Sequence, residues 1–499
     1  MAFAIEWQYL TERSWAARAS SRQEPEWPPH PDRVFSALVA AWGERGEDEA
    51  ERAALEWLER LGPPDVYAPP LAAPESDSLD AAPSTSTVRG SAPGTYVIPN
   101  EVASDKKQRD DAAFFGRPLK RRTFPSVLTG TATCALVWPD ADPGPYRDAL
   151  LRLVSEVTYV GTSRSFIRAW LDDTASASGH RWRPSGTTET PDEHLRVAEP
   201  GRLAALREDY NGTDADARPR LARQRGYSAV VDDETPGGRF SPELFILRTQ
   251  AHARTSVSHG PAVVDALRRR LIAVARDSRM DAEAMRLISG HEADGAASRA
   301  GHVALAPLPF VGHPHADGHL MGVALAFPND ASEHQRLAVL YALARVLSEG
   351  TRTVELSLGA HRVVTLMAED RDNPPRATRP STWTAPSDAW ATVTPLAPDR
   401  HPPRRCADPD AFLRDDLAGA CERQGLPRPV EVALLGASRF SGAPHARQYA
   451  PLRTKAGSRR RLAHVTIRFA EPVRGPLLLG AGRFRGYGVF RPLRSRAEG

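Results

Sequence analysis

At 499 residues, the chain is too long for one ordinary hydrophobic core, so two domains or two related halves are expected. The apolar fraction of 41% and the charged fraction of 25% are typical of a soluble globular protein. No apolar run approaches the roughly 18 residues that a membrane span needs, and the three cysteines match neither a zinc pattern nor a disulfide framework. We therefore expect a cytoplasmic protein without membrane contact.

Strands and helices alternate in the N-terminal part. Alternating apolar residues predict a strand at 3–10, and helical spacing predicts a helix over 34–42. The remaining elements expected before residue 172 are a helix over 48–61, a strand over 133–139, a helix over 146–157 and a short strand over 158–163. Residues 172–238 are rich in proline, glycine and charge, contain no assignable element, and are the expected domain boundary.

The C-terminal part has a clearer pattern. Its first elements are expected in the order strand, helix, strand, strand, helix, strand, at 243–250, 261–277, 302–311, 320–328, 333–347 and 353–359. That order is the split unit of ferredoxin-like folds. A second, irregular version follows, with strands at 389–396, 430–436 and 462–469 and a helix at 411–424. We predict an α+β protein with tandem ferredoxin-like domains, at about 243–360 and 388–493.

Positive charge is concentrated near the C-terminus, although the net charge is only +3. Residues 453 to 496 contain one acidic residue, Glu471, and twelve basic ones: Arg453, Lys455, Arg459, Arg460, Arg461, Arg468, Arg474, Arg483, Arg485, Arg491, Arg494 and Arg496. A basic tract beside glycines indicates a polyanionic partner, most simply a nucleic acid. The alternative is a solvated arginine-rich surface.

A glycine-rich segment, "GPLLLGAGRFRGYGVFRP", ends this tract. Its glycines at 480, 482, 486 and 488 alternate around Arg483 and Arg485. Glycines let a backbone approach a ligand and offer N–H groups to phosphates, while arginines supply charge and stacking. No helix follows the segment, so it is not a dinucleotide-binding fingerprint. The alternative is a glycine-rich hairpin required for tight packing.

Five blocks in order resemble one known family. They are "EWPPHPDRVFSALVAA", "RTFPSV", "ISGHEADG", "HVALAPLPFVGHPHADGHLMGVALAFP" and the glycine-rich segment, which together run from about residue 3 to residue 493. The glycine-rich segment resembles the C-terminal loop of the RAMP superfamily of CRISPR systems. All blocks together look like the fused Cas-five/Cas-six subunit of type I-G (formerly I-U) systems.

The resemblance implies a function and an organisation. Such proteins cut precursor CRISPR RNA within its repeats and stay on the mature RNA inside the Cascade complex, beside its seven-type backbone subunit and its large subunit. Residues 1–238 would form a RAMP-like, five-type half that holds the 5′ handle. Residues 239–499 would form the six-type endoribonuclease, built from two ferredoxin-like units. The implied reaction is attack of a 2′-hydroxyl on the adjacent phosphate, without a metal or another cofactor.

That reaction needs a base, an acid and positive charge at the phosphorane, and histidine suits both proton roles because its ordinary pKa is about 6.5. In six-type enzymes the catalytic histidine commonly follows the first helix of the first unit, which makes His291 the leading candidate. His302 and His315 are the other catalytic candidates. His313 and His319 are expected to be structural, because glycine and proline around them are typical of turns. Capping or packing roles remain open for His291 and His302, and solvent exposure for His315.

A metal site is an alternative for "HPHADGH", residues 313–319. It nearly matches the HxHxDH ligand run of metallo-β-lactamase-fold hydrolases, but Gly318 separates Asp317 from His319 and breaks the spacing. A metal-dependent phosphoester hydrolase and a binding module without cleavage are therefore the two rival functions.

Two groups of residues are expected to bind RNA. The first is the glycine-rich loop, with Gly480, Gly482, Arg483, Arg485, Gly486 and Gly488. The second is a basic segment in the N-terminal half that would hold the 5′ handle, with Arg117, Lys120, Arg121 and Arg122. The alternative for the second group is a basic loop beside a strand.

Overall fold

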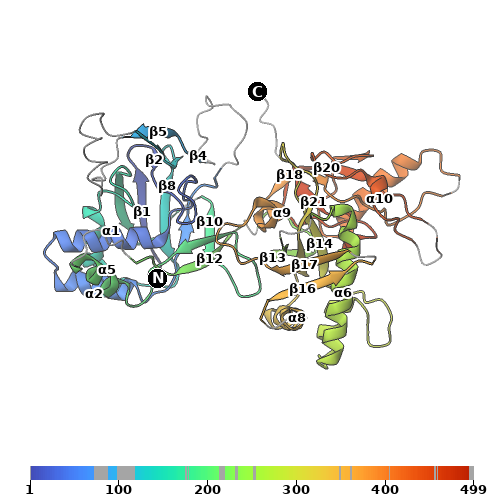
Figure 1. Ribbon diagram of the computed structural model, residues 1–499, viewed down its shortest axis with the longest axis horizontal. Helices are drawn as coiled ribbons and strands as arrows, with labels where there is room; N and C mark the ends of the chain where they lie inside the picture. The colour runs from blue at the N-terminus through green and yellow to red at the C-terminus, as the bar shows by residue number, and fades with distance from the viewer. Residues whose placement is uncertain are drawn as a thin grey trace, which may run out of the picture. The chain divides into compact units, whose positions relative to one another are not determined.

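The computed structural model describes residues 2–71, 88–97, 119–174, 177, 179–212, 220–230, 234–250, 254–347, 350–359, 362–403, 405–453, 457 and 459–493. The chain forms two compact units (Figure 1). The first consists of Met1–Pro184 and Glu193–Val230, and the second of Ser185–Asp192 and Val231–Gly499. Both contain helices and antiparallel sheets, so the predicted α+β class is confirmed. None of the helices in the described ranges is long and apolar enough to cross a membrane.

A seven-stranded antiparallel sheet is the centre of the first unit. Its strand order is β11-β12-β10-β3-β8-β1-β9. The strands are β1 (Phe3–Tyr9), β3 (Asp65–Tyr67), β8 (Thr133–Trp138), β9 (Ile167–Asp172), β10 (Arg181–Pro184), β11 (Glu193–Arg196) and β12 (Gln224–Ala229). The alternation of side chains in β1 explains why both of its faces are buried. Phe3, Ile5 and Trp7 face the main core, whereas Ala4 faces a small second cluster on the other side of the sheet.

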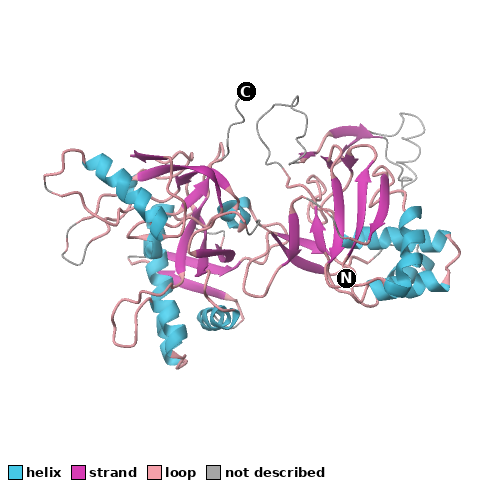
Figure 2. Ribbon diagram, turned by 180° about the vertical axis from the view of Figure 1, so that it is seen from behind, coloured by secondary structure: helices cyan, strands magenta, loops and turns pink. Residues whose placement is uncertain are grey.

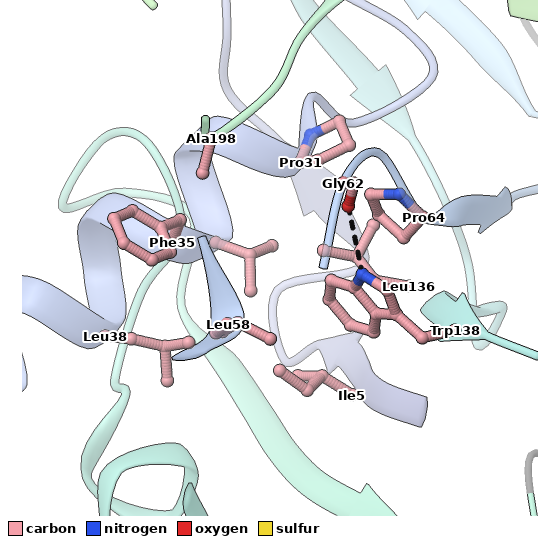
Figure 3. Close-up of a pocket in the computed structure, with 11 residues that line it drawn as sticks. Ile5, Pro31, Phe35, Leu38, Leu58, Gly62, Pro64, Leu136, Trp138 and Ala198 are labelled. Atoms are coloured by element: carbon pink, nitrogen blue, oxygen red, sulfur yellow. Dashed lines mark hydrogen bonds between the residues drawn. The ribbon is translucent and has the colours of Figure 1, made fainter. Parts of the chain in front are cut away.

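Four helices gather at one side of this sheet (Figure 2). They are α1 (Pro31–Glu44), α2 (Glu49–Leu58), α4 (Arg147–Glu156) and α5 (Arg202–Asn211). A small apolar pocket lies among Ile5, Phe35, Leu136 and neighbouring side chains, and the indole N–H of Trp138 at its edge donates to the carbonyl oxygen of Gly62 at 3.2 Å (Figure 3). The pocket is therefore a gap in the core of this unit, lined mainly by apolar side chains.

Short strands form two further sheets in this unit. One joins β2 (Arg13–Ser14), β7 (Ser126–Leu128) and β4 (Arg89–Ser91), and the other pairs β5 (Gly94–Val97) with β6 (Lys120–Thr123). The prediction of a strand at 158–163 was wrong, because these residues form bends and one isolated bridge. The strand of this region is β9, which begins at Ile167. The unassigned stretch 172–238 contains β10, β11, α5 and β12.

The second unit begins with a five-stranded antiparallel sheet, in the order β14-β15-β13-β17-β16. Its strands are β13 (Phe240–Thr249), β14 (Ala304–Pro309), β15 (Leu320–Pro328), β16 (Thr353–Ser357) and β17 (Val363–Ala368). The expected hairpin of β14 and β15 is confirmed by their antiparallel register. β17 was not expected, and it lies between β13 and β16.

Both faces of this sheet are buried, which explains the continuous apolar sequence of β14 and β15. Leu305, Val323 and Leu325 face a cluster with the helices, and Ala304 and Ala324 face a second cluster. The helices are α6 (Gly260–Asp277), α7 (Ala282–Ser289) and α8 (Glu333–Val346). α7 was not expected from the sequence, although Asp281 caps it and Gly290 ends it at φ +75°.

A four-stranded antiparallel sheet completes the unit, in the order β19-β20-β18-β21. It consists of β18 (Ser387–Thr392), β19 (Glu431–Leu435), β20 (His464–Val473) and β21 (Phe490–Pro492), with helix α10 (Pro409–Arg423). Helix α10 packs against β19, and the segment from β20 to β21 contains the glycine-rich loop instead of a second long helix.

Candidate functional site

The glycine-rich loop, residues 480–488, has a backbone that only glycine allows at three positions. Gly480, Gly486 and Gly488 have φ of +83°, +81° and +66°. A Cβ at Gly488 would overlap the carbonyl oxygen of Leu479, and one at Gly486 would lie 3.2 Å from Pro307 Cδ. The loop therefore folds tightly on itself and lies against β14 and α6.

The two arginines of the loop differ in environment. Arg485 is half exposed and pairs with Asp265 of α6 at 3.1 Å. Arg483 is more buried: its Nη1 donates to the carbonyl oxygen of Gly480 at 3.0 Å, and burial lowers its pKa. The buried Nε of Arg483 has no hydrogen-bond partner among the described residues. Both arginines thus have a carboxylate neighbour, Asp265 for Arg485 and Asp399 for Arg483 at 3.7 Å, and Arg483 in addition retains an unused donor.

Arg268 of α6 joins the loop to the histidine region. Its guanidinium donates to the carbonyl oxygens of Ile288 at 2.7 Å, Val303 at 2.8 Å and Phe484 at 3.1 Å. Burial lowers the pKa of Arg268 to about 10. The end of α7, the start of β14 and the glycine-rich loop are therefore held at one point.

His302 packs inside this junction. Its ring stacks on Phe484, with ring centroids 3.6 Å apart, and a Cβ at Gly290 would lie 2.8 Å from its Nε2. Burial, then the nearby charges of Arg268 and Arg483, lowers the pKa of His302 to about 3. The imidazole is neutral at physiological pH, and it fills space between the loop and α7.

His291 is exposed beside the same junction. Its Nδ1 lies 3.1 Å from the carbonyl oxygen of Ser289, and its charge acts on the pKa of His302. The structure therefore brings together His291, His302, Arg483 and Arg485 of the sequence-predicted residues. We call this group, with Arg268, the loop-side cluster.

His315 lies elsewhere. It is in the β14–β15 hairpin, exposed, and its backbone N–H donates to His313 Nδ1 at 3.1 Å. His302 precedes β14 and the hairpin follows it, so the six residues of this strand separate the two by about 20 Å. His302 and His315 therefore lie near opposite ends of β14.

The hairpin packs against the segment after β19. A Cβ at Gly318 would overlap the carbonyl oxygen of Gly442, and the backbone N–H of Gly312 donates to the carbonyl oxygen of Ser441 at 3.0 Å. Among the described residues, no group of three or more histidine, cysteine or acidic side chains is gathered closely enough to hold a metal ion.

Polar residues gather near the start of α6, and of these the sequence analysis had singled out only Asp317 and His319. His259 contacts Arg362, and Arg254 pairs with Asp317 at 3.1 Å. Asp317 also accepts a hydrogen bond from His319 at 2.5 Å. The sequence "SVSHGP" before a predicted helix was the available signal for His259, but its partner lies 103 positions away.

The basic residues of the first unit were predicted from one segment. Lys120, Arg121 and Arg122 lie on exposed β6, and Arg117 falls outside the described residues. A second basic site contains aromatic rings. The guanidinium carbon of Arg164 lies 5.8 Å from the ring centre of Trp15 and 5.0 Å from that of Phe124.

Comparison with known proteins identifies the family. No curated protein matches the chain in sequence. A family model described as "CRISPR-associated protein, GSU0054 family" matches residues 3–492, which is nearly the whole chain. The protein therefore belongs to the GSU0054 family of CRISPR-associated proteins and has its role in CRISPR defence.

Proposed function

We propose that this protein binds precursor CRISPR RNA, cleaves it within the repeat by attack of a 2′-hydroxyl, and stays on the mature RNA as a Cascade subunit. The observation that carries the proposal is the loop-side cluster. A glycine-rich loop whose Arg483 keeps an unused Nε donor lies beside the exposed His291, in a CRISPR-associated chain. Phosphate binding and proton transfer are the two capacities that RNA cleavage requires.

The two units suggest a division of work. The second unit contains the β-α-β-β-α-β order expected of a ferredoxin-like, six-type endoribonuclease, extended by α7 and β17. The first unit would hold the 5′ handle, through Lys120, Arg121 and Arg122 of β6 and through the arginine and aromatic side chains near Trp15. Stacking between aromatic rings and bases gives single-stranded RNA a binding surface without a sequence code. The partners proposed are the seven-type backbone subunit and the large subunit.

Cleavage by 2′-hydroxyl attack does not depend on which histidines transfer the protons. The predicted candidates for these transfers are His291, His302 and His315. His291 has an exposed ring beside the loop, so it can reach RNA there. His302 is neutral and packed on Phe484, which suits a positioning role better than donation of a proton. His315 is exposed at the other end of β14.

The reaction class is tested with the full-length protein and labelled repeat RNA in EDTA, beside a substrate with deoxyribose at the nucleotide 5′ of the cut. We expect cleavage of the RNA substrate alone, with a 2′,3′-cyclic phosphate and a 5′-hydroxyl as products. Loss of cleavage in EDTA would favour a metal-dependent hydrolase. Tight binding of the repeat without cleavage would favour a binding module.

A further inference from the structure

A second group of histidines, arginines and an aspartate lies at the start of α6. It consists of Arg254, His259, Asp317, His319 and Arg362, and we call it the α6-start cluster. Its members come from the segment before α6, from the β14–β15 hairpin and from the residue before β17. Three chain segments far apart in sequence therefore contribute polar side chains to one place.

His259 is held as a neutral imidazole beside a cation. Arg362 Nη1 is in hydrogen-bond contact with His259 Nε2, and a guanidinium can only donate. Nε2 therefore accepts, and the ring proton is on Nδ1, which lies 3.4 Å from Ser258 Oγ. Partial burial, then the charge of Arg362, lowers the pKa of His259. A neutral imidazole next to a positive charge has the properties of a general base beside a phosphate-binding group.

Arg362 has no carboxylate partner among the described residues, in contrast to Arg485 of the loop-side cluster. Its charge is available to an incoming anion. A phosphate that approached Arg362 would weaken the contact with His259 Nε2 and free that nitrogen to accept a proton.

His319 is held by a carboxylate in the opposite way. Its Nδ1 donates to Asp317 Oδ1 at 2.5 Å, and Asp317 Oδ2 accepts from Arg254 at 3.1 Å. The hydrogen bond from His319 is the main cause of the lowered pKa of Asp317. A carboxylate on Nδ1 fixes the tautomer and stabilises the imidazolium, which leaves Nε2 to give a proton. His319 is 21% exposed, so the ring is accessible but oriented.

The two histidines lie in one small region. Ser256 and His319 face each other across an isolated antiparallel bridge, which places their Cα atoms about 5 Å apart. The backbone N–H of Val257 donates to the carbonyl oxygen of Gly318 at 2.9 Å, and that of His259 donates to the carbonyl oxygen of Ser256 at 3.0 Å. His259 is thus one short turn away from the residue paired with His319.

Resting on the proposed RNA cleavage, we infer that the α6-start cluster performs its chemistry, with His259 as base and His319 as acid. His259 takes the proton of the 2′-hydroxyl as the 2′-oxygen forms a bond to phosphorus. The bond from phosphorus to the 5′-oxygen breaks, and His319 gives that oxygen a proton. Arg362 contacts the phosphorane, and Asp317 is a positioning residue that acts through His319. The products are a 2′,3′-cyclic phosphate and a 5′-hydroxyl, and exchange of protons with water restores both histidines.

This inference gives the loop-side cluster the role of holding RNA. His302 is packed on Phe484 and neutral there, and the guanidinium of Arg268 already donates to three carbonyl oxygens. The α6-start cluster, by contrast, supplies a neutral base, a carboxylate-held acid and a cation without a carboxylate partner among the described residues. These are the three groups that the reaction needs.

The test is single-turnover cleavage of repeat RNA by the full-length protein and variants His259→Ala and His319→Ala. His334→Ala, an exposed histidine of α8, is the matched control. We expect each of the two variants to lose about 10²- to 10⁴-fold in rate while binding of RNA changes less than threefold. His259→Gln and His319→Gln repeat the measurement with side chains of similar size, in case an alanine variant does not fold.

A second substrate separates the acid from the base. In it, sulfur replaces the 5′-bridging oxygen at the cut, and a thiolate leaves without needing a proton. We expect this substrate to restore the rates of His319→Ala and Asp317→Asn to within about tenfold of the wild type, but not that of His259→Ala. A structural defect would not be rescued in this selective way.

The outcomes distinguish the inference from the proposed function. If the wild type cleaves and both histidine variants cleave within threefold of it, the inference is wrong and the proposed function stands. The same holds if only His291→Ala loses activity. If the wild type does not cleave repeat RNA, the proposed function fails and this inference falls with it.

Discussion

Arg268→Met offers a direct test of how the glycine-rich loop is held. Methionine replaces the aliphatic part of the side chain but removes the guanidinium and its three hydrogen bonds to the carbonyl oxygens of Ile288, Val303 and Phe484. Each hydrogen bond from a charged group contributes about 1.5–3 kcal/mol, or about 4.5–9 kcal/mol for three. The substitution also relieves the cost of burying a charge.

That relief follows from the pKa of Arg268, which burial lowers from its ordinary value to about 10. The lowering corresponds to about 3 kcal/mol at about 1.4 kcal/mol for each factor of ten. The net loss in the free energy of unfolding is therefore expected near 3 kcal/mol, since the neighbouring carbonyl groups relax in part.

Urea unfolding measures this loss, and hydrogen exchange of a peptide covering 480–490 reports whether the loop is released. Arg269→Met is the matched control, because Arg269 is exposed and, within the described ranges, donates only to the carbonyl oxygen of Asp265 in its own helix. We expect faster exchange of the loop in Arg268→Met alone. If both variants unfold within about 0.5 kcal/mol of each other, Arg268 does not anchor the loop.

Two further predictions concern the ends of β14. Gly318→Ala should destabilise the protein by more than about 2 kcal/mol in urea unfolding, because Gly318 has a φ of +71° and a Cβ there would overlap the backbone of Gly442. Gly295→Ala is the control, since Gly295 has a φ of +83° but no atom within 4 Å of the added Cβ. Equal losses of stability in the two variants would contradict the clash. His302→Phe should keep the stack on Phe484 but remove a pH dependence. Since the folded pKa is about 3 and the unfolded value 6.5, the wild type loses stability as the pH falls through this window, by up to about 1.4 kcal/mol per pH unit. Unfolding at pH 4.5, 5.5 and 7.5 checks the difference, and equal slopes would refute it.

The sequence predicted elements whose signals are local. The strand at 3–10, the helix over 261–277 and the hairpin strands of residues 302–328 combine periodic apolar residues with turn residues, and all are confirmed. β10 was missed because it has four residues and pairs with β3, more than 100 positions earlier. β17 was missed although a local signal existed: its sequence is mostly apolar, and it forms a hairpin with the neighbouring β16, with Ser357 opposite Val363. Its pairing with β13 is distant, as is that of β10 with β3, and no pattern within a strand reports such partners.

The sequence predicted the part of the candidate site that has an unusual local composition. Glycines alternating with arginines identified the loop, and the structure gives the reason, since three of these glycines have positive φ. The same reasoning took Gly318 as a turn residue and considered Asp317 only within a metal-ligand run whose spacing is broken. In the structure Asp317 lies in the hairpin loop and holds both His319 and Arg254, and the partner Arg254 lies 63 positions earlier, where a local pattern does not reveal it.

Division of work between two different sets of side chains fits a protein that must cut RNA and then keep it. Arg485 of the loop-side cluster is paired with Asp265, so RNA has to compete for it, and binding there should weaken with salt. In the α6-start cluster, His259 depends on Arg362 and His319 on Asp317. The two clusters adjoin along α6, since a Cβ at Gly486 would lie 3.3 Å from Pro261 Cα, but they share no side chain, so departure of the cut end from the α6-start cluster leaves the contacts at the loop intact. Product retention then requires no change of conformation, because the groups that cut and the groups that hold are different ones.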